Sequence, residues 1–419
     1  MATRIEADVL IPGSGDSINK GCVIFEGRIL SYAGPIENAP RPSSSDLTVS
    51  APVVMPGLWD CHTHFQGLRN ATVEEQLTTD LSVSLLRSVA DAGKALRAGF
   101  TSVRELGGHG IQLNRGVKEG SIPGPHIYGA GTYISQTGGH NDIHALPIEF
   151  VQYWANLREV PGPCDGITEC RRAVRKVLRL GAAVVKVAAS GGVMSELDNP
   201  VNQQFSDEEL RAMVEEANRA GRIVAAHCHG KAGIMAALRA GAHTIEHGSY
   251  LDDEAADLML EKGAMLVPTR LIIKGIAETG EKSGLPAYMM EKTRAVVDRH
   301  LQSMRLAIRR KIPIAMGTDI FGSSSVAPAY WGENGRELTY LVEEGGMSPL
   351  EAIQAATADA PRTLGPMAPK SGQLRAGFDA DVIVVKEDPL KRISVLGQPE
   401  NILRVWKDGK LEVERPLGG

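Results

Sequence analysis

Between residues 58 and 319 the chain alternates short apolar segments with longer amphipathic ones, and this alternation constrains its fold more than any other feature. The apolar segments are hydrophobic on both faces, which is typical of parallel strands covered by helices on either side. Eight such strands are expected, at residues 58–64, 100–106, 126–131, 184–189, 223–229, 243–247, 265–272 and 313–319. Eight strands separated by helices predict an α/β fold, a (β/α)8 TIM barrel rather than an open sheet.

The helices between these strands are marked by spacing and by caps. Apolar residues at helical intervals predict one helix over residues 73–96 and another over residues 291–310. The run Ser206-Asp207-Glu208-Glu209 has the pattern of a capping box and predicts a helix that continues to Arg219.

The two ends of the chain have a different character. Short β segments are expected at residues 7–11, 22–26, 28–33 and 47–54, and again at 377–385 and 402–413. Neither end is long enough to bury a core alone. We therefore expect residues 1–55 and 367–419 to meet in one small composite β-sandwich, and residues 56–366 to form the barrel domain.

Composition excludes several classes of protein. The 419 residues carry a net charge of −5, which gives no electrostatic footprint for nucleic acid. No stretch resembles a secretory signal or a membrane span, so a cytoplasmic location without a membrane partner is expected. Five cysteines without a framework spacing favour reduced thiols over disulfides.

Polar residues gather where the predicted strands end. Catalytic residues of such barrels lie at the carboxyl ends of the strands, whereas residues at the opposite ends stabilise the fold. Alternate residues of a strand share one face, so the two histidines of each His-x-His pair point together, as a divalent metal requires. The strand-end residues are His62, His64, His227, His229, His247 and Asp319.

Lys186 lies inside the fourth predicted strand, Val184–Ala189. Its ammonium group would lose hydration there, which lowers the pKa and leaves a neutral amine. Such an amine can add carbon dioxide to form a carbamate, an anionic ligand able to bridge two metal ions. The alternative is a structural lysine whose amine reaches the barrel mouth or pairs with a carboxylate.

The remaining histidines divide between structural and functional interpretations. His126 and His243 begin strands and are expected to be structural, while His109 and His300 are expected to be loop and helix-surface residues. His140 follows the third strand at the mouth, where contact with a substrate and ordering of the loop are both open.

The six candidate metal ligands resemble, in their order and strand placement, the binuclear metal centre of the amidohydrolase superfamily. They are His62, His64, Lys186, His227, His247 and Asp319. The resemblance extends to the terminal β-sandwich and therefore covers nearly the whole chain. The connecting segments are similar to the branch that holds the ochratoxinase-like and prolidase-like metallo-carboxypeptidases. They are residues 55–65, 135–147, 185–195, 198–200, 223–250 and 317–319.

This resemblance implies a division of roles within the site. His62, His64 and Asp319 would hold the more buried metal, His227 and His247 the more exposed one, and carboxylated Lys186 would bridge the two. Zinc is the expected ion, because the ligands are imidazoles and carboxylates. Asp319 would also carry the proton, and His229 would bind the oxyanion.

The implied reaction is hydrolysis of an amide bond to a C-terminal α-amino acid, of the ochratoxin A or N-acyl-phenylalanine type, by a hydroxide that bridges the metals. Candidates for binding the substrate carboxylate are His140, Lys231 and Arg270. The mouth loop departs from its relatives at Asn141, where glycine is common, so the substrate is less certain than the reaction.

Other functions are weighed beside this one. The alternative enzymes are a Xaa-Pro or Xaa-Arg/Lys dipeptidase and an imidazolonepropionase-like cyclic-amide hydrolase, and the alternative of another class is a non-catalytic structural barrel. Analogy with the superfamily implies a homo-oligomer, often an octamer.

Overall fold

The computed structural model of the protein describes residues 2–70 and 72–416. The strands are β1 (Thr3–Leu10), β2 (Ile18–Glu26), β3 (Ile29–Pro35), β4 (Leu47–Pro56), β5 (Leu58–Leu68), β6 (Phe100–Glu105), β7 (His126–Gly129), β8 (Tyr133–Ile134), β9 (Val185–Ala188), β10 (Val224–Cys228), β11 (Thr244–His247), β12 (Met265–Val267), β13 (Ile320–Gly322), β14 (Val382–Val385), β15 (Ile402–Lys407) and β16 (Lys410–Glu414). The helices are α1 (Val73–Thr78), α2 (Leu81–Arg97), α3 (Gly110–Lys118), α4 (Ile148–Leu157), α5 (Gly166–Leu180), α6 (Asp207–Arg219), α7 (Lys231–Ala240), α8 (Asp253–Lys262), α9 (Arg270–Thr279), α10 (Ala287–Arg309), α11 (Arg336–Glu343) and α12 (Pro349–Ala355).

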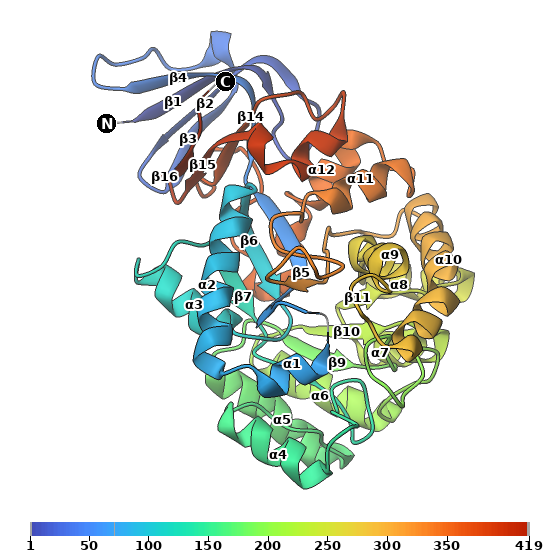
Figure 1. Ribbon diagram of the computed structural model, residues 1–419. Coiled ribbons are helices and arrows are strands. Elements are labelled where there is room, and N and C mark those ends of the chain that lie inside the picture. The colour runs from blue at the N-terminus through green and yellow to red at the C-terminus, as the bar shows by residue number, and fades with distance from the viewer. Residues whose placement is uncertain (1, 71, 417–419) are drawn as a thin grey trace.

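Strands from both ends of the chain form one mixed sheet, which lies at the upper left of Figure 1. Its order is β16-β15-β14-β4-β1-β2-β3, and the two ends meet where β14 pairs antiparallel with β4. The sheet has its own apolar core, in which the rings of Phe25 and Trp406 pack edge to face at 6.1 Å. The hydrogen bonding runs through all seven strands as a single sheet.

The middle of the chain forms two further sheets whose paired strands are all parallel. Their orders are β12-β11-β10-β9-β8 and β13-β5-β6-β7, and helices surround the strands in Figure 1. Every residue of β9, β10, β11 and β12 is buried. This double-sided burial is the reason that the strands read as continuous apolar runs in the sequence.

The strand predicted at residues 313–319 is largely irregular. Only Ile314 forms a bridge, with Leu266, and β13 begins one residue after the predicted end. Backbone hydrogen bonds still hold the segment between its neighbours, because Leu266 N–H donates to Pro313 O at 2.9 Å and Cys61 N–H donates to Met316 O at 2.9 Å. The segment therefore runs from β12 to β5 and ends at Asp319.

Among the predicted elements whose boundaries differ from the observed ones, two also differ in kind. The helix predicted over residues 73–96 is two helices, because the Asp80 carboxylate accepts the N–H groups of Ser82 and Val83 and so begins α2. The strand predicted over residues 265–272 ends at Val267, and residues from Arg270 onward are helical. The capping box at Ser206 is present as predicted.

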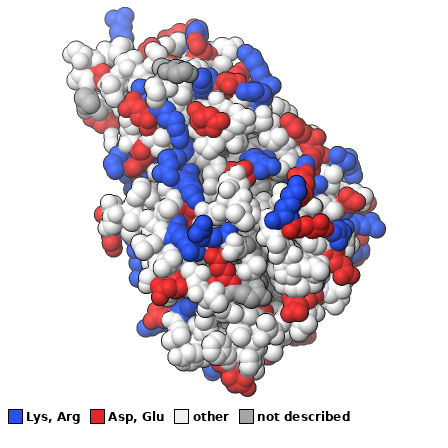
Figure 2. Space-filling view, viewed as in Figure 1, with Lys and Arg blue, Asp and Glu red and all other residues white. Residues whose placement is uncertain are grey.

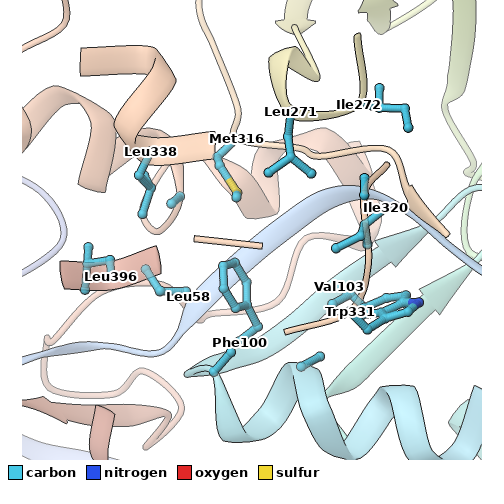
Figure 3. Packing of buried hydrophobic residues seen from close by; sticks show 14 of the residues in the cluster. Leu58, Phe100, Val103, Leu271, Ile272, Met316, Ile320, Trp331, Leu338 and Leu396 are labelled. Carbon is cyan, nitrogen blue, oxygen red and sulfur yellow. The ribbon is translucent and has the colours of Figure 1, made fainter. Parts of the chain in front are cut away.

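The largest apolar core joins β5 and β6 to the segments that follow β13 (Figure 3). Leu58, Phe100 and Trp331 are almost completely buried there, and the Phe65 and Trp331 rings stack at 4.1 Å. Burying such a side chain stabilises the fold by about 1.5–3 kcal/mol. This packing fixes β5, the strand that carries His62 and His64.

The prediction that His300 lies on a helix surface is wrong, whereas His109 is the loop residue that was predicted. His300 is completely buried, and its Nε2–H donates to Pro268 O at 2.6 Å, because α10 packs against α9. His109 precedes α3 as a loop residue but is buried with its Nε2 2.6 Å from Ser84 Oγ.

Lys and Arg side chains are interspersed with Asp and Glu on the face shown in Figure 2. The five cysteines are free and buried. Within residues 2–70 and 72–416, no helix combines the length and hydropathy needed to cross a bilayer.

Candidate metal centre

The six predicted ligands come from five segments of the chain and lie in one cavity. His62 and His64 lie on β5, Lys186 on β9 and His227 on β10. His247 ends β11, and Asp319 immediately precedes β13. All six residues line a cavity of about 440 Å³.

His62, His64 and Asp319 form the first potential metal-binding group. One ligand atom from each lies within 4.8 Å of the others. Asp319 Oδ1 is 3.1 Å from His64 Nε2 and 3.5 Å from His62 Nε2. The hydrogen bond from Asp319 N–H to His62 O, at 2.7 Å, sets this geometry through the backbone.

His227, His229 and His247 form the second group, also within 4.8 Å. The His247 ring centroid lies 4.6 Å from that of His227 and 4.9 Å from that of His229. It is also 5.0 Å from the His62 centroid, so the two groups adjoin. His229, which was expected to bind the oxyanion, therefore belongs to the same group as the two predicted ligands, His227 and His247.

Lys186 lies beside the first group, and its side chain lines the cavity. Its Nζ is 3.5 Å from His62 Nε2, and the residue is only 2% exposed. Burial lowers the pKa of Lys186 to about 8, although Glu246 and Asp319 act in the opposite direction. The amine therefore does not escape to solvent.

Most of the histidines are oriented by a second partner. Nδ1–H of His62 donates to Glu246 Oε2 at 2.8 Å, and that of His64 donates to Gly107 O at 2.9 Å. The Nδ1 atoms of His229 and His247 lie 2.7 Å from the hydroxyls of Ser249 and Thr269. A partner at Nδ1 fixes the ring and leaves Nε2 to face the site, as metal-ligating histidines require.

A buried ion pair, which was not predicted from the sequence, supports the His62 contact. Arg104 Nη2 binds Glu246 Oε1 at 2.7 Å and Oε2 at 2.9 Å, and both residues are completely buried. Arg104 Nε also donates to Cys61 O at 2.6 Å. The signal was available, because Arg104 and Glu246, like Lys186, are charged residues inside apolar strands.

The protonation states suit metal binding. Burial lowers the pKa of His62 to about 4 and that of His229 to about 3, and it lowers the pKa values of His227 and His247 well below their usual range. Burial alone would raise the pKa of Asp319, but His62 and His64 outweigh it and lower that pKa. Neutral imidazoles and an ionised carboxylate are the forms that bind a divalent cation.

Three residues at the site also have a strained backbone conformation. His247, Thr269 and Asp319 have φ angles of 66°, 57° and 60°, in the left-handed region that residues other than glycine seldom adopt. Such conformations persist where the surrounding structure enforces them and cluster at functional sites.

His140 and Asn141 belong to the mouth of the cavity. His140 Nδ1 is 2.9 Å from Ser195 Oγ, and its ring stacks on that of His227 at 4.2 Å. A Cβ on Gly192 would lie 2.0 Å from the His140 ring, so this approach requires glycine. Asn141 Nδ2 donates to Tyr133 O at 2.6 Å, which gives this residue a loop-ordering contact.

The other two carboxylate-binding candidates lie outside the cavity lining. Lys231 begins α7, and its Nζ pairs with Asp252 at 2.5 Å and Glu254 at 2.6 Å. Arg270 begins α9, and its Nε donates to Glu344 at 2.8 Å. Both charges are already neutralised by acidic side chains from neighbouring segments, which the sequence did not reveal.

The protein belongs to the amidohydrolase family, whose model matches residues 53–411. The chain is 44% identical to ochratoxinase of Aspergillus niger, over 98% of this chain and 86% of that protein. The crystal structure of A. niger ochratoxinase superposes with a TM-score of 0.89 at 42% identity, over 99% of this chain and 96% of that one. A Xaa-Pro dipeptidase crystallised with methionine in its active site is 31% identical, with a TM-score of 0.88 over 99% and 100% of the two chains.

The family resemblance seen in the sequence is thus confirmed, and the protein is a hydrolase that acts on amide bonds. Amidohydrolases generally use divalent metals, and the two neighbouring donor groups fit such ions. This fit rests on four histidines with lowered pKa values, of which His62, His229 and His247 also have a partner at Nδ1.

Proposed function

We propose that the protein is a binuclear metal-dependent amidohydrolase that cleaves the amide bond to a C-terminal α-amino acid with a free carboxylate, as in ochratoxin A or N-acyl-phenylalanine. The observation that carries this proposal is the convergence of two three-residue donor groups in one cavity, with Lys186 Nζ against His62 of the first group. The 44% identity to ochratoxinase over almost the whole chain supports the substrate class.

His62, His64 and Asp319 would hold one ion, His227 and His247 the other, and carboxylated Lys186 would bridge them, with zinc as the expected metal. The lowered pKa of Lys186 supports carboxylation, because a larger fraction of the amine is neutral and can add carbon dioxide. Two divalent cations would lower the pKa of a water molecule and polarise the amide carbonyl.

The residues around the ions move the proton and stabilise charge. Asp319, ionised and 3.1 Å from His64, would accept the proton of the attacking water and deliver it to the leaving amine. His229 would donate a hydrogen bond from Nε2 to the developing oxyanion, while Ser249 holds its Nδ1.

The cavity is compatible with an aromatic amide. Its volume of about 440 Å³ falls in the range of small-molecule sites. Apolar side chains from α9 and the mouth loops, including Ile272, Ile273 and Met194, contribute to its walls. A phenyl ring or a fused aromatic acyl group would bury its surface against these walls.

We also propose that the two parallel sheets form one (β/α)8 barrel over residues 56–366. Residues 1–55 and 367–419 would form the β-sandwich, in which the single seven-stranded sheet folds over its own apolar core. Two contacts support closure at the gaps between the sheets. Ala183 N–H donates to Gly129 O at 2.9 Å beside β7 and β9, and Ala315 N–H donates to Leu266 O at 3.0 Å beside β12.

A Xaa-Pro dipeptidase is the second candidate, because a structure of that activity superposes with a TM-score of 0.88 at 31% identity. Xaa-Arg/Lys dipeptides and cyclic amides complete the panel of substrates. We propose a homo-oligomer by analogy with the family, to be measured by light scattering.

The proposal is tested by metal analysis and hydrolysis of this panel by the purified holoenzyme. We expect two zinc ions per chain, a carbon dioxide adduct on Lys186 in the crystal structure, and hydrolysis of ochratoxin A and N-acyl-phenylalanine. One metal per chain with an unmodified Lys186 would contradict the binuclear site, and metal-loaded protein without hydrolysis of any amide would support a structural barrel.

A further inference from the structure

One lysine, Lys186, and one arginine, Arg158, line the described part of the cavity. Lys186 lies among the metal-binding residues, and its charge would be lost on carboxylation. Arg158 directly follows α4, and its Cζ lies 4.6 Å from the centre of the Trp154 ring. Among the lysine and arginine side chains of this lining, Arg158 is therefore the one that remains available to a substrate.

The Arg158 guanidinium has no acidic partner. Among residues 2–70 and 72–416, no carboxylate or carbonyl oxygen accepts a hydrogen bond from its side chain. The two acidic residues of the lining are engaged elsewhere, since Asp142 accepts the N–H of Gly138 and Asp319 contacts the histidines of β5. The stacking on Trp154 leaves the five N–H donors of the guanidinium edge unused.

The surroundings of Arg158 are partly dehydrated. Burial lowers the pKa of Arg158, and its charge adds to the burial that lowers the pKa of His109 to about 4. Three apolar side chains from the same stretch of the chain also line the cavity, namely Val151, Ala155 and Val160. An unpaired cation in such a place is unfavourable, and an anion that enters the cavity would relieve that cost.

The geometry points to a carboxylate-binding subsite formed by Arg158 and Trp154, which selects substrates that carry a carboxylate. Arg158 thus replaces Lys231 and Arg270, the candidates from the sequence, as the residue that binds a substrate carboxylate. The role of this subsite in catalysis rests on the proposed function. A planar guanidinium held against an indole ring presents two parallel N–H groups, which match the two oxygens of a carboxylate.

The first test compares Arg158→Gln with the wild-type holoenzyme on matched substrates. N-benzoyl-phenylalanine and N-benzoyl-phenylalaninamide differ only in the α-carboxylate. N-(4-carboxybenzoyl)-phenylalaninamide and N-benzoyl-phenylalaninamide differ only in a carboxylate on the acyl group. The readout is the ratio of kcat/KM for the acid to that for its uncharged partner.

We expect Arg158→Gln to lower one of these ratios by about 10- to 100-fold, mainly through KM, as loss of a charge-assisted hydrogen bond predicts. The pair that responds identifies which carboxylate Arg158 binds. Arg158→Lys, which keeps the charge but not the fork, should lower the same ratio less. Arg172→Gln, an exposed arginine on α5, is the matched control and should change neither ratio.

A binding experiment separates this subsite from the proposed reaction. Calorimetry with the holoenzyme measures 4-phenylbutanoate against 4-phenylbutan-1-ol, neither of which contains an amide. Tighter binding of the acid by the wild type than by Arg158→Gln would support the subsite even if the protein hydrolysed no amide on the panel. Equal affinities in the two proteins, with both kinetic ratios unchanged, would overturn it.

Discussion

His62 Nδ1 donates to Glu246 Oε2 across 2.8 Å, although 184 residues separate the two in the chain. The same carboxylate binds Arg104, so a completely buried chain of three side chains links β5, β11 and β6. Coulombic attraction to Arg104 and the hydrogen bond from His62 lower the pKa of Glu246, despite the burial that would raise it. Glu246 therefore stays ionised and holds His62 with Nε2 directed at the metal site.

Glu246→Gln should weaken metal binding without removing a ligand. The amide cannot accept the His62 N–H and pair with Arg104 as a carboxylate does, so we expect affinity for the first metal to fall by about 10- to 100-fold. Competition with a chelator, followed by metal analysis, measures the change. Glu254→Gln, an exposed carboxylate on α8, is the control, and equal metal retention in the two variants would contradict the role of Glu246.

Asp319→Asn should retain fold and metal but lose turnover. Asparagine keeps an oxygen ligand, whereas it cannot accept and return a proton at neutral pH. We expect kcat to fall by at least about 100-fold, the usual contribution of a general acid and base. Near-normal kcat in a variant with full metal content would remove Asp319 from proton transfer.

His229→Ala distinguishes the two positions that the geometry allows for this residue. If His229 binds the oxyanion, kcat should fall by about 100- to 1,000-fold while KM and metal content change little. Loss of one metal per chain would show instead that His229 is a ligand alongside His227 and His247. Metal analysis and steady-state kinetics on the same preparation give both answers.

His300→Gln should flatten the dependence of stability on pH. Burial lowers the pKa of His300 from 6.5 to about 4, so the unfolded chain binds a proton that the folded protein excludes. Stability is then complete above pH 6.5 and falls as the pH drops towards 4, by up to about 3 kcal/mol.

Glutamine can still donate a hydrogen bond to Pro268 O but does not titrate. Urea unfolding at several pH values should therefore show a shallower acid slope for His300→Gln than for the wild type. Arg299→Gln, its exposed neighbour on α10, should retain the wild-type slope. Parallel slopes for all three proteins would mean that His300 is not the titrating group.

Local sequence patterns predicted much of the fold. The strands β6, β9, β10 and β11 occur close to where apolar runs placed them, because burial on both faces leaves a continuous hydrophobic signal. The capping box at Ser206 begins α6 because the side chains of Ser206 and Glu209 accept each other's backbone N–H groups, which is also a local interaction. The break at Asp80 was missed, because apolar spacing continues across it while a side-chain cap interrupts the hydrogen bonds.

The candidate metal-binding residues could also be chosen from the sequence. Histidines two residues apart on one strand share a face, and a lysine within an apolar strand signals a function, so the donors could be chosen without coordinates. Their grouping as two adjoining sets, and the position of His229 beside His247, appeared only when the strands were assembled.

What the sequence by itself determined was the family, the order of most strands and the residue types able to hold metal, since these follow from periodicity and side-chain chemistry. Tertiary structure alone decided which charges are free. Lys231 and Arg270 are paired with acids from other segments, whereas Arg158 faces the cavity without one. Electrostatic pairing depends on distances of a few ångströms between residues far apart in the chain, and no local pattern encodes those distances.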